Sequence, residues 1–278
     1  MNLFQALLLG IVEGVTEFLP VSSTGHLTIV EKLLGLRVDD AGVTAFTAII
    51  QVGAIAAVLV YFRTDIVTMA AAWFRGFVDL EARQRPEYRL AWFVIAGSIP
   101  IGLVGFLGKD VIAGPLRNLW VVAAALVLWS GAMYAAERLG SQQRSEGQMR
   151  LRDALIIGFM QCIALIPGVS RSGATISAGL FCGLDRVTAT RVSFFLSIPA
   201  LVAAGAYEGL TAAPDISASV GWTPTAVATA VSFVVAYASV AWLLRLVVNH
   251  PITVFIGYRL VLGAAVAVAL SAGFISAT

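Results

Sequence analysis

Glu13-Gly-Val-Thr-Glu-Phe-Leu-Pro-Val-Ser-Ser-Thr-Gly-His26 is the stretch that decides the fold of this chain. A related stretch, Gln161-Cys-Ile-Ala-Leu-Ile-Pro-Gly-Val-Ser-Arg-Ser-Gly-Ala-Thr175, begins 148 residues later (161 − 13). At this offset Ser22 falls on Ser170 and Gly25 falls on Gly173. Each stretch breaks an apolar segment with a proline and a group of hydroxyl side chains. The chain therefore contains an internal repeat, and its two copies carry nearly all of the polar residues outside the loops.

The composition is that of a membrane protein. The 278 residues are 59% hydrophobic and 12% charged, with a mean hydropathy of +0.90, whereas a soluble domain carries about 25% charged residues. The net charge of +2 and the lack of a basic cluster with aromatic residues argue against nucleic acid as a partner. The beginning of the chain lacks a basic segment before its apolar run, so a cleaved signal peptide is not expected. We therefore predict an all-α polytopic membrane protein.

Six apolar segments are long enough to cross a bilayer, which takes about 20 helical residues. They are residues 41–62, 90–108, 119–137, 192–208, 224–244 and 253–274. Two further apolar segments, residues 3–34 and 153–182, are each interrupted near their middle. A half of about ten residues rises only about 15 Å as a helix, half of the bilayer core. We predict two re-entrant helical hairpins, whose irregular turns need surrounding protein or a wet cavity at that depth.

Three spans follow each hairpin, so the second half must enter the membrane from the opposite side. This arrangement is an inverted-topology repeat within one membrane domain, residues 1–278, with residues 1–140 as the first repeat and residues 150–278 as the second. With both termini outside, the inner loops hold twelve basic residues and the outer loops four, as the positive-inside rule requires. The inner residues are Arg63, Arg75, Arg83, Arg85, Arg89, Arg138, Arg144, Arg150, Arg152, Arg186, Arg191 and Arg245, and the outer residues are Lys32, Arg37, Lys109 and Arg117. Residues 63–89 also carry aromatic residues that favour the membrane interface, and residues 209–222 are expected to form a loop.

The acidic residues Glu13 and Glu17 are four positions apart and share one helical face. Two carboxylates at mid-membrane depth repel each other and are expensive to bury. One explanation is a carboxyl that stays protonated. The explanation that we favour is a divalent cation held between them, which removes the repulsion and supplies a Lewis acid. Gln51, inside a span, either supports this site or ties two helices together.

The hydroxyl and basic residues of the two motifs fit a phosphorylated ligand. Free N–H groups at the start of each second half-helix would bind anionic oxygens. Arg171 would add a guanidinium that matches phosphate. His26 could move a proton near neutral pH or act as a nucleophile, whereas Arg259 is expected to extend to the inner interface. The residues predicted to bind the ligand are Ser22, Thr24, Gly25, Gln51, Ser170, Ser172, Gly173 and Thr175.

Together the two motifs closely resemble those of the bacterial undecaprenyl-diphosphate phosphatase family, also called the bacitracin-resistance family. The first motif runs from Glu13 through Glu17 to Val-Ser-Ser-Thr-Gly-His26, the second runs from Pro167 to Thr175, and both are complete. The resemblance implies an enzyme of the bacterial cytoplasmic (inner) membrane that removes the terminal phosphate from a polyprenyl diphosphate lipid. It also implies a divalent cation such as Mg²⁺ or Ca²⁺, a periplasmic active site, and catalytic roles for Glu13, Glu17, Ser23, His26 and Arg171.

Several alternatives stay open at this point. Ser23 could attack the phosphorus with His26 as its base, His26 could be the nucleophile, or His26 could activate water. A transporter or flippase of a polyprenyl phosphate is the competing function, because inverted repeats with broken helices are also a transporter plan. Chain-length specificity and oligomeric state are not determined by the sequence, and a homodimer is one of the open states.

Overall fold

The computed structural model describes residues 1–37, 40–108, 111–112, 116, 118–211 and 216–277. Within these residues it forms helices and no strand, only an isolated bridge between Arg144 and Leu184. Six helical segments are long and apolar enough to cross a membrane, as predicted. They are Ala41–Tyr61 (α3), Pro86–Leu107 (α5), Leu119–Leu139 (α7), Arg186–Tyr207 within α10, Trp222–Asn249 (α12) and Ile252–Ser271, which joins the 3₁₀ turn η4 (Ile252–Phe255) to α13 (Ile256–Ser271). The all-α polytopic membrane fold is therefore confirmed.

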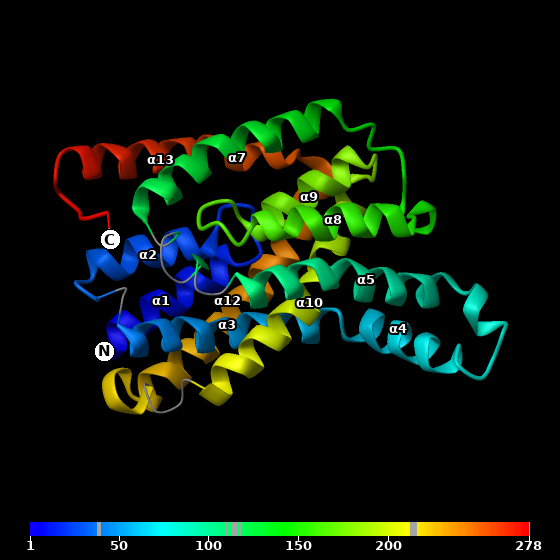
Figure 1. Ribbon diagram of the computed structural model, residues 1–278, viewed down its shortest axis with the longest axis horizontal. Helices are drawn as coiled ribbons and strands as arrows, with labels where there is room; N and C mark the ends of the chain where they lie inside the picture. Colours follow the sequence, from blue (N-terminus) through cyan, green and yellow to red (C-terminus); the bar gives the residue numbers. More distant parts are fainter. Residues whose placement is uncertain (38–39, 109–110, 113–115, 117, 212–215, 278) are drawn as a thin grey trace.

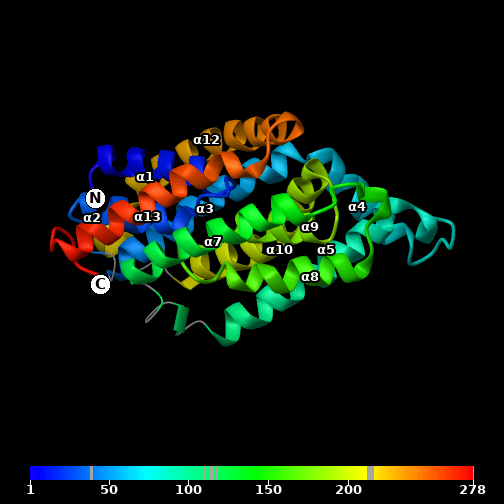
Figure 2. The ribbon, with the colours of Figure 1, turned by 90° about the horizontal axis from the view of Figure 1, so that it is seen from above.

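Four shorter helices form the two broken segments. The first pair is α1 (Leu3–Thr16) and α2 (Ser23–Leu33), and the second is α8 (Leu151–Ile163) and α9 (Arg171–Phe181). None exceeds 14 residues, about 21 Å of helix, which is too short to cross a bilayer. In Figures 1 and 2 the first pair lies toward the end that holds both termini and the second pair toward the opposite end, with their turns near the middle. Their re-entrant course in a bilayer, and the inverted repeat, stay predictions.

The two halves of the chain pack into each other. Helix α1 lies along α12, and α8 lies along α5. The first short helix of each pair therefore packs on a long helix of the other half. Glycines permit both crossings: a Cβ added at Gly10 would lie 2.6 Å from the Ala228 carbonyl oxygen, and one at Gly158 would lie 2.1 Å from that of Gly97. Gly10 and Gly158 are equivalent at the 148-residue offset. The result is one shared core rather than two separate units.

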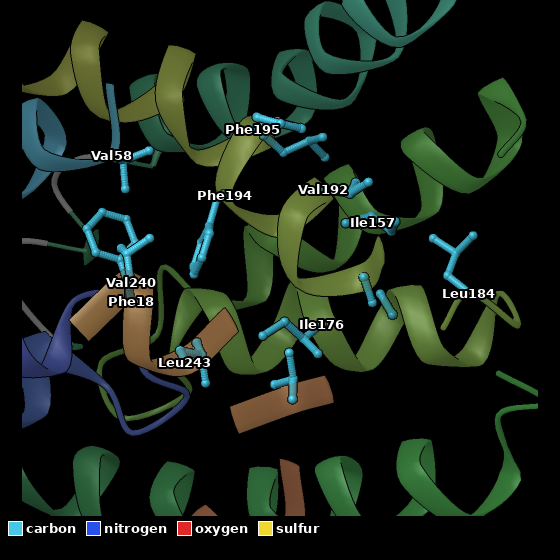
Figure 3. Close-up of a cluster of buried hydrophobic side chains, with 14 of the residues drawn as sticks. Phe18, Val58, Ile157, Ile176, Leu184, Val192, Phe194, Phe195, Val240 and Leu243 are labelled. Carbon is cyan, nitrogen blue, oxygen red and sulfur yellow. The ribbon is translucent and has the colours of Figure 1, made fainter. Parts of the chain in front are cut away.

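The largest cluster of buried apolar side chains includes Phe18, Leu19 and Val21 of the first motif turn. Figure 3 shows its members from the first turn and from α3, α8, α9, α10 and α12. Phe18 of the first turn meets Phe194 of α10 edge to face, with ring centroids 5.3 Å apart. Edge-to-face aromatic packing adds about 1 kcal/mol beyond apolar burial. This cluster therefore supports the backbone that carries the polar residues of the first motif.

The end of the molecule opposite the termini holds α4 (Arg63–Arg75), the 3₁₀ turn η1 (Ala82–Gln84) and the linker with η2 (Glu146–Gln148) (Figure 1). Arg191 of α10 ties α4 to this linker through Asp65, at 2.6 Å, and Glu146, at 3.2 Å. Arg186 pairs with Glu137 in the same region of the chain. These contacts fix the Arg-rich segments on one side of the bundle.

Two predicted loops are only partly described. The prediction that residues 209–222 form a loop is wrong at both ends, because α10 continues to Thr211 and Ile216–Val220 form a π-helical turn, η3. Residues 212–215 lie outside the described residues, as do Lys109 and Arg117 of the loop between α5 and α7. A helical turn satisfies backbone groups that an irregular loop would leave unpaired, as where Gly221 N donates to the Ile216 carbonyl at 2.8 Å.

Candidate active site

The two motif turns have the same backbone geometry. Ser22 and Ser170 immediately precede α2 and α9, with φ angles of 77° and 76°. Each serine Oγ accepts a hydrogen bond from a glycine N–H three residues later: Gly25 N at 3.4 Å and Gly173 N at 3.2 Å. Serine is a preferred N-cap, but a positive φ is uncommon for a residue with a Cβ. Strained caps of this kind persist where the surrounding structure holds them, often at functional sites.

The turns also contact each other directly. Ser22 Oγ accepts a hydrogen bond from the Gly168 N–H at 3.1 Å, and Ser170 Oγ donates to the Leu19 carbonyl at 3.4 Å. These contacts bring the N-termini of α2 and α9 to the same place. The first N–H groups of a helix have no partner within the helix and lie at the positive end of its dipole, so this convergence has the chemistry that favours an anion.

Glu17 joins the two halves chemically. Its Oε1 accepts from Arg171 Nη2 at 2.5 Å and from Gln51 Nε2 at 3.1 Å, and its Oε2 accepts from Ser23 Oγ at 2.5 Å. The Glu17 side chain is almost fully buried, whereas that of Arg171 is 14% exposed. Short bonds of this kind are typical of charge-assisted pairs. Glu17 thus holds a hydroxyl and a guanidinium together at the helix N-termini, and Gln51 belongs to the site rather than only tying helices.

Both imidazole nitrogens of His26 contact groups other than the Ser23 hydroxyl. Its Nδ1 lies 2.7 Å from the Ser22 carbonyl oxygen, and its Nε2 lies 2.6 Å from the Tyr258 hydroxyl. The expected pairing of Ser23 with His26 is therefore not the pairing in the structure, where Ser23 has a carboxylate partner. Sequence reasoning missed Tyr258, which lies far along the chain and in no motif.

Arg259 does not extend to the interface, so that prediction is wrong. It is fully buried, and its guanidinium donates to the Pro20 and Gly168 carbonyls, both at 3.0 Å, and to Val169 O at 3.2 Å. Further acceptors are Ser130 Oγ, Ala125 O and Leu126 O. Irregular turns leave carbonyls without helical partners, and the five N–H groups of arginine can satisfy several at once. Arg259 therefore stabilises both motif turns.

Comparison with known proteins identifies the family of the chain. The family model described as bacitracin resistance protein BacA matches residues 6–265. This chain belongs to the BacA family. It is 59% identical to undecaprenyl-diphosphatase 3 of Frankia casuarinae over 278 residues, which cover 100% of both chains. It is 56% identical over 270 residues to the undecaprenyl-diphosphatase of Cutibacterium acnes, with 95% of each covered, and 55% identical over 277 residues to that of Acidothermus cellulolyticus, with 100% of each covered.

The divalent cation expected for a BacA protein can be tested against the acidic pair. Glu13 lies one helical turn before Glu17 and is 1% exposed, and its Oε1 has no hydrogen-bond partner among the described residues. An unpaired buried carboxylate oxygen beside a second carboxylate fits a cation. Groups of three or more ligating side chains are absent from the described part of the chain. A cation here would take its remaining ligands from phosphate and water, as Mg²⁺ commonly does.

The remaining predicted residues are of two kinds: Thr24 is accessible, whereas Ser172 and Thr175 make contacts within the protein. Thr24 is exposed beside half-buried Ser23, which leaves the start of α2 accessible. Ser172 Oγ lies 3.2 Å from Ser170 Oγ, so it supports the second cap. Thr175 is fully buried, and its hydroxyl bonds to Ser193 Oγ at 2.6 Å and to Arg171 O at 2.8 Å. Thr175 therefore ties α9 to α10 within the protein and orients Arg171 through its backbone.

Proposed function

We propose that this chain hydrolyses undecaprenyl diphosphate to undecaprenyl phosphate and inorganic phosphate within the bacterial cytoplasmic membrane. The observation that carries the proposal is the Glu17 cluster, in which a serine hydroxyl, a guanidinium and two helix N-termini converge. Full-length identity of 59% to an undecaprenyl-diphosphatase supports the same activity. The reaction would regenerate the lipid carrier of cell-wall precursors and confer bacitracin resistance.

The diphosphate would bind where the two turns meet. Arg171 is the exposed member of the Glu17 pair, so its outer N–H groups can bind phosphate oxygens while Glu17 holds the inner face. The unpaired N–H groups at the starts of α2 and α9 would bind the other oxygens. Charge that develops on the phosphoryl oxygens during transfer would be stabilised by the same donors.

Ser23 is the nucleophile that this geometry favours. Its hydroxyl already donates to Glu17 at 2.5 Å, so Glu17 would accept the proton as Ser23 Oγ bonds to the terminal phosphorus. The bond from that phosphorus to the bridging oxygen breaks, and undecaprenyl phosphate leaves. Water then attacks the phosphoserine, phosphate leaves, and Glu17 returns its proton to Ser23. The alternatives are His26 as base, as nucleophile or as activator of water.

The acidic pair supports a divalent cation, Mg²⁺ or Ca²⁺, as cofactor. Glu13 and Glu17 would hold it, and the unpaired Glu13 Oε1 is the atom that most needs such a partner. When bound, the cation would neutralise phosphate charge and act as a Lewis acid.

The orientation that we propose places both termini and the active site on the periplasmic side. Both termini lie at one end of the molecule, opposite α4 and the Arg-rich linker (Figures 1 and 2). The positive-inside rule supports this assignment. A homodimer stays a prediction that light scattering of the detergent-solubilised protein would test.

Phosphate release from undecaprenyl or farnesyl diphosphate, measured on purified protein in detergent with Mg²⁺ or Ca²⁺, tests the function. We expect release by the wild type, trapped phosphoserine at low pH after brief turnover, and neither with Ser23→Ala. Thr28→Ala is the matched control, because its hydroxyl lies on α2 and, among the described residues, bonds only to the Thr24 carbonyl at 2.8 Å. Folded wild-type protein that releases no phosphate would contradict the function. A phosphohistidine trapped in a parallel quench at alkaline pH, where that adduct is stable, would contradict only the role of Ser23.

A further inference from the structure

Tyr258 links the surface of the bundle to the buried histidine. It lies in the first turn of α13, and its ring stacks on that of His26 with centroids 5.5 Å apart and an interplanar angle of 13°. Its hydroxyl oxygen lies 2.6 Å from His26 Nε2. Tyr258 is 51% exposed, whereas His26 is 8% exposed. The mechanism derived above assigns Tyr258 no role.

The contacts of His26 determine which nitrogen carries the hydrogen. Nδ1 lies 2.7 Å from the Ser22 carbonyl, and a carbonyl oxygen can only accept, so Nδ1 is the donor. In the neutral imidazole the lone pair is then on Nε2, and the Tyr258 hydroxyl must donate to it. Both ring nitrogens are fixed, and the ring cannot turn without breaking one of these bonds.

We propose that His26 takes part in hydrolysis of the lipid diphosphate, in one of the three roles left open for it above, and that Tyr258 is a positioning residue that sets its tautomer and orientation. This inference rests on the proposed function and deepens it. When Nε2 takes up a proton, the contact persists, because the tyrosine oxygen then accepts from Nε2–H while its own hydrogen turns to the exposed side. One hydroxyl thus holds the ring in both protonation states.

The position of Tyr258 is itself fixed by its neighbour in the chain. Arg259 donates to the Pro20 carbonyl at 3.0 Å, which attaches the start of α13 to the first motif turn. Ser22, two residues after Pro20, supplies the carbonyl that binds His26 Nδ1. The first turn of α13 therefore holds the turn and the imidazole in register with each other.

Tyr258→Phe tests this role because it keeps the ring and removes only the hydroxyl. We expect kcat to fall by about tenfold with KM changed by less than about twofold, because an orienting contact acts on the reaction step rather than on substrate binding. Tyr237→Phe is the matched control, since it removes a hydroxyl from the Tyr61–Tyr237 pair on another face and should leave kcat unchanged. An unchanged kcat in Tyr258→Phe would overturn the proposal.

A spectroscopic measurement tests the tautomer without reference to activity. The chain has two histidines, so ¹⁵N labelling of histidine gives two imidazoles, and His250→Gln assigns them. Wild-type His26 should be protonated on Nδ1, and Tyr258→Phe should shift its Nε2 signal. A neutral His26 ring that carries its hydrogen on Nε2 instead of Nδ1, or identical His26 spectra in the two proteins, would overturn the positioning role. If the wild type released no phosphate, the proposed function would fail while this spectrum still tested the contact.

Discussion

The two motif turns share one backbone and carry different chemistry. Ser22 and Ser170 have the same positive φ, the same capping bond and reciprocal contacts to the opposite turn. At the next position the first turn has Ser23 and the second has Arg171, and both side chains bind one carboxylate, Glu17. The duplicated feature is therefore the scaffold that presents a helix N-terminus, and the side chains on it have diverged.

The acidic position shows the same divergence more sharply. Gln161 is equivalent to Glu13 at the 148-residue offset. Both are buried, and neither Gln161 Nε2 nor Gln161 Oε1 has a partner within the described ranges. The second half keeps a polar side chain there but has lost the charge, and Ala174 stands where the first half has His26. One half supplies the acids and the hydroxyl, the other supplies the guanidinium, and neither half alone has a complete site.

Removing Arg171 should have the largest effect, because it deletes the contribution of the second half. We expect Arg171→Ala to lower kcat/KM by about 10³-fold, as for loss of a key donor to a developing oxyanion. It should also destabilise the fold by about 3 kcal/mol, because Glu17 is left buried without its guanidinium partner. Phosphate release and thermal unfolding in detergent measure the two effects.

A double variant separates the effect of Arg171 on activity from its effect on stability. Glu17→Gln/Arg171→Ala removes the uncompensated charge, so it should recover most of the lost stability and none of the activity. Recovery of activity in the double variant would show that Arg171 serves only to neutralise Glu17 and that Glu17 is not the base for Ser23.

Replacing Arg259 should have the next largest effect, because this one side chain donates to carbonyls of both motif turns. Arg259→Met keeps the length of the side chain but leaves the Pro20 and Gly168 carbonyls without donors, at a cost of about 1–3 kcal/mol for each buried group. We expect a large fall in thermal stability together with lost activity, and an intermediate result for Arg259→Lys. If Arg259→Met unfolds at the wild-type temperature, the two turns are held by other contacts.

Much of this fold could be predicted from the sequence, for physical reasons. Length and apolarity determine which helices can span a bilayer, so the six spans were predicted correctly, with ends that differ by several residues. The motif serines also marked the starts of α2 and α9. Arg259 and Tyr258 could not be placed from the sequence. Their partners, Pro20 and His26 respectively, lie more than 230 residues earlier in the chain. Only the packing of α13 on the first turn brings these groups together, and no local pattern encodes that packing.

The pairing of Ser23 was unpredictable for a related reason. Attack by Ser23 with His26 as its base was one of three alternatives that the sequence left open. The turn between α1 and α2 instead brings Glu17 back over the start of α2, and the Ser22 carbonyl and Tyr258 take both nitrogens of His26. The geometry of an irregular turn is not contained in residue spacing.

The equivalent glycines Gly10 and Gly158 test whether the two crossings are equally tight. An added Cβ would meet a carbonyl oxygen at 2.6 Å for Gly10 and at 2.1 Å for Gly158. Overpacking of this kind costs about 1–3 kcal/mol, so we expect Gly158→Ala to destabilise the protein more than Gly10→Ala in detergent melts. Gly131→Ala is the control, because its Cβ would meet no described atom within 4 Å. Equal melting temperatures for the three variants would mean that the crossings relax freely.

The smallest effect should come from the caps, where the halves are most alike. Ser22→Ala and Ser170→Ala each remove a capping bond to a glycine N–H, and loss of an N-cap costs about 1 kcal/mol. Between the turns, Ser22 also accepts from the Gly168 N–H at 3.1 Å, whereas Ser170 makes a weaker donation to Leu19 O at 3.4 Å. Chemical denaturation should therefore rank Ser22→Ala as slightly less stable than Ser170→Ala. Ser170→Gly loses the same cap but relieves the positive φ, so it should be at least as stable as Ser170→Ala. The reverse order for the two alanine variants would place the stronger contact between the turns on the second half.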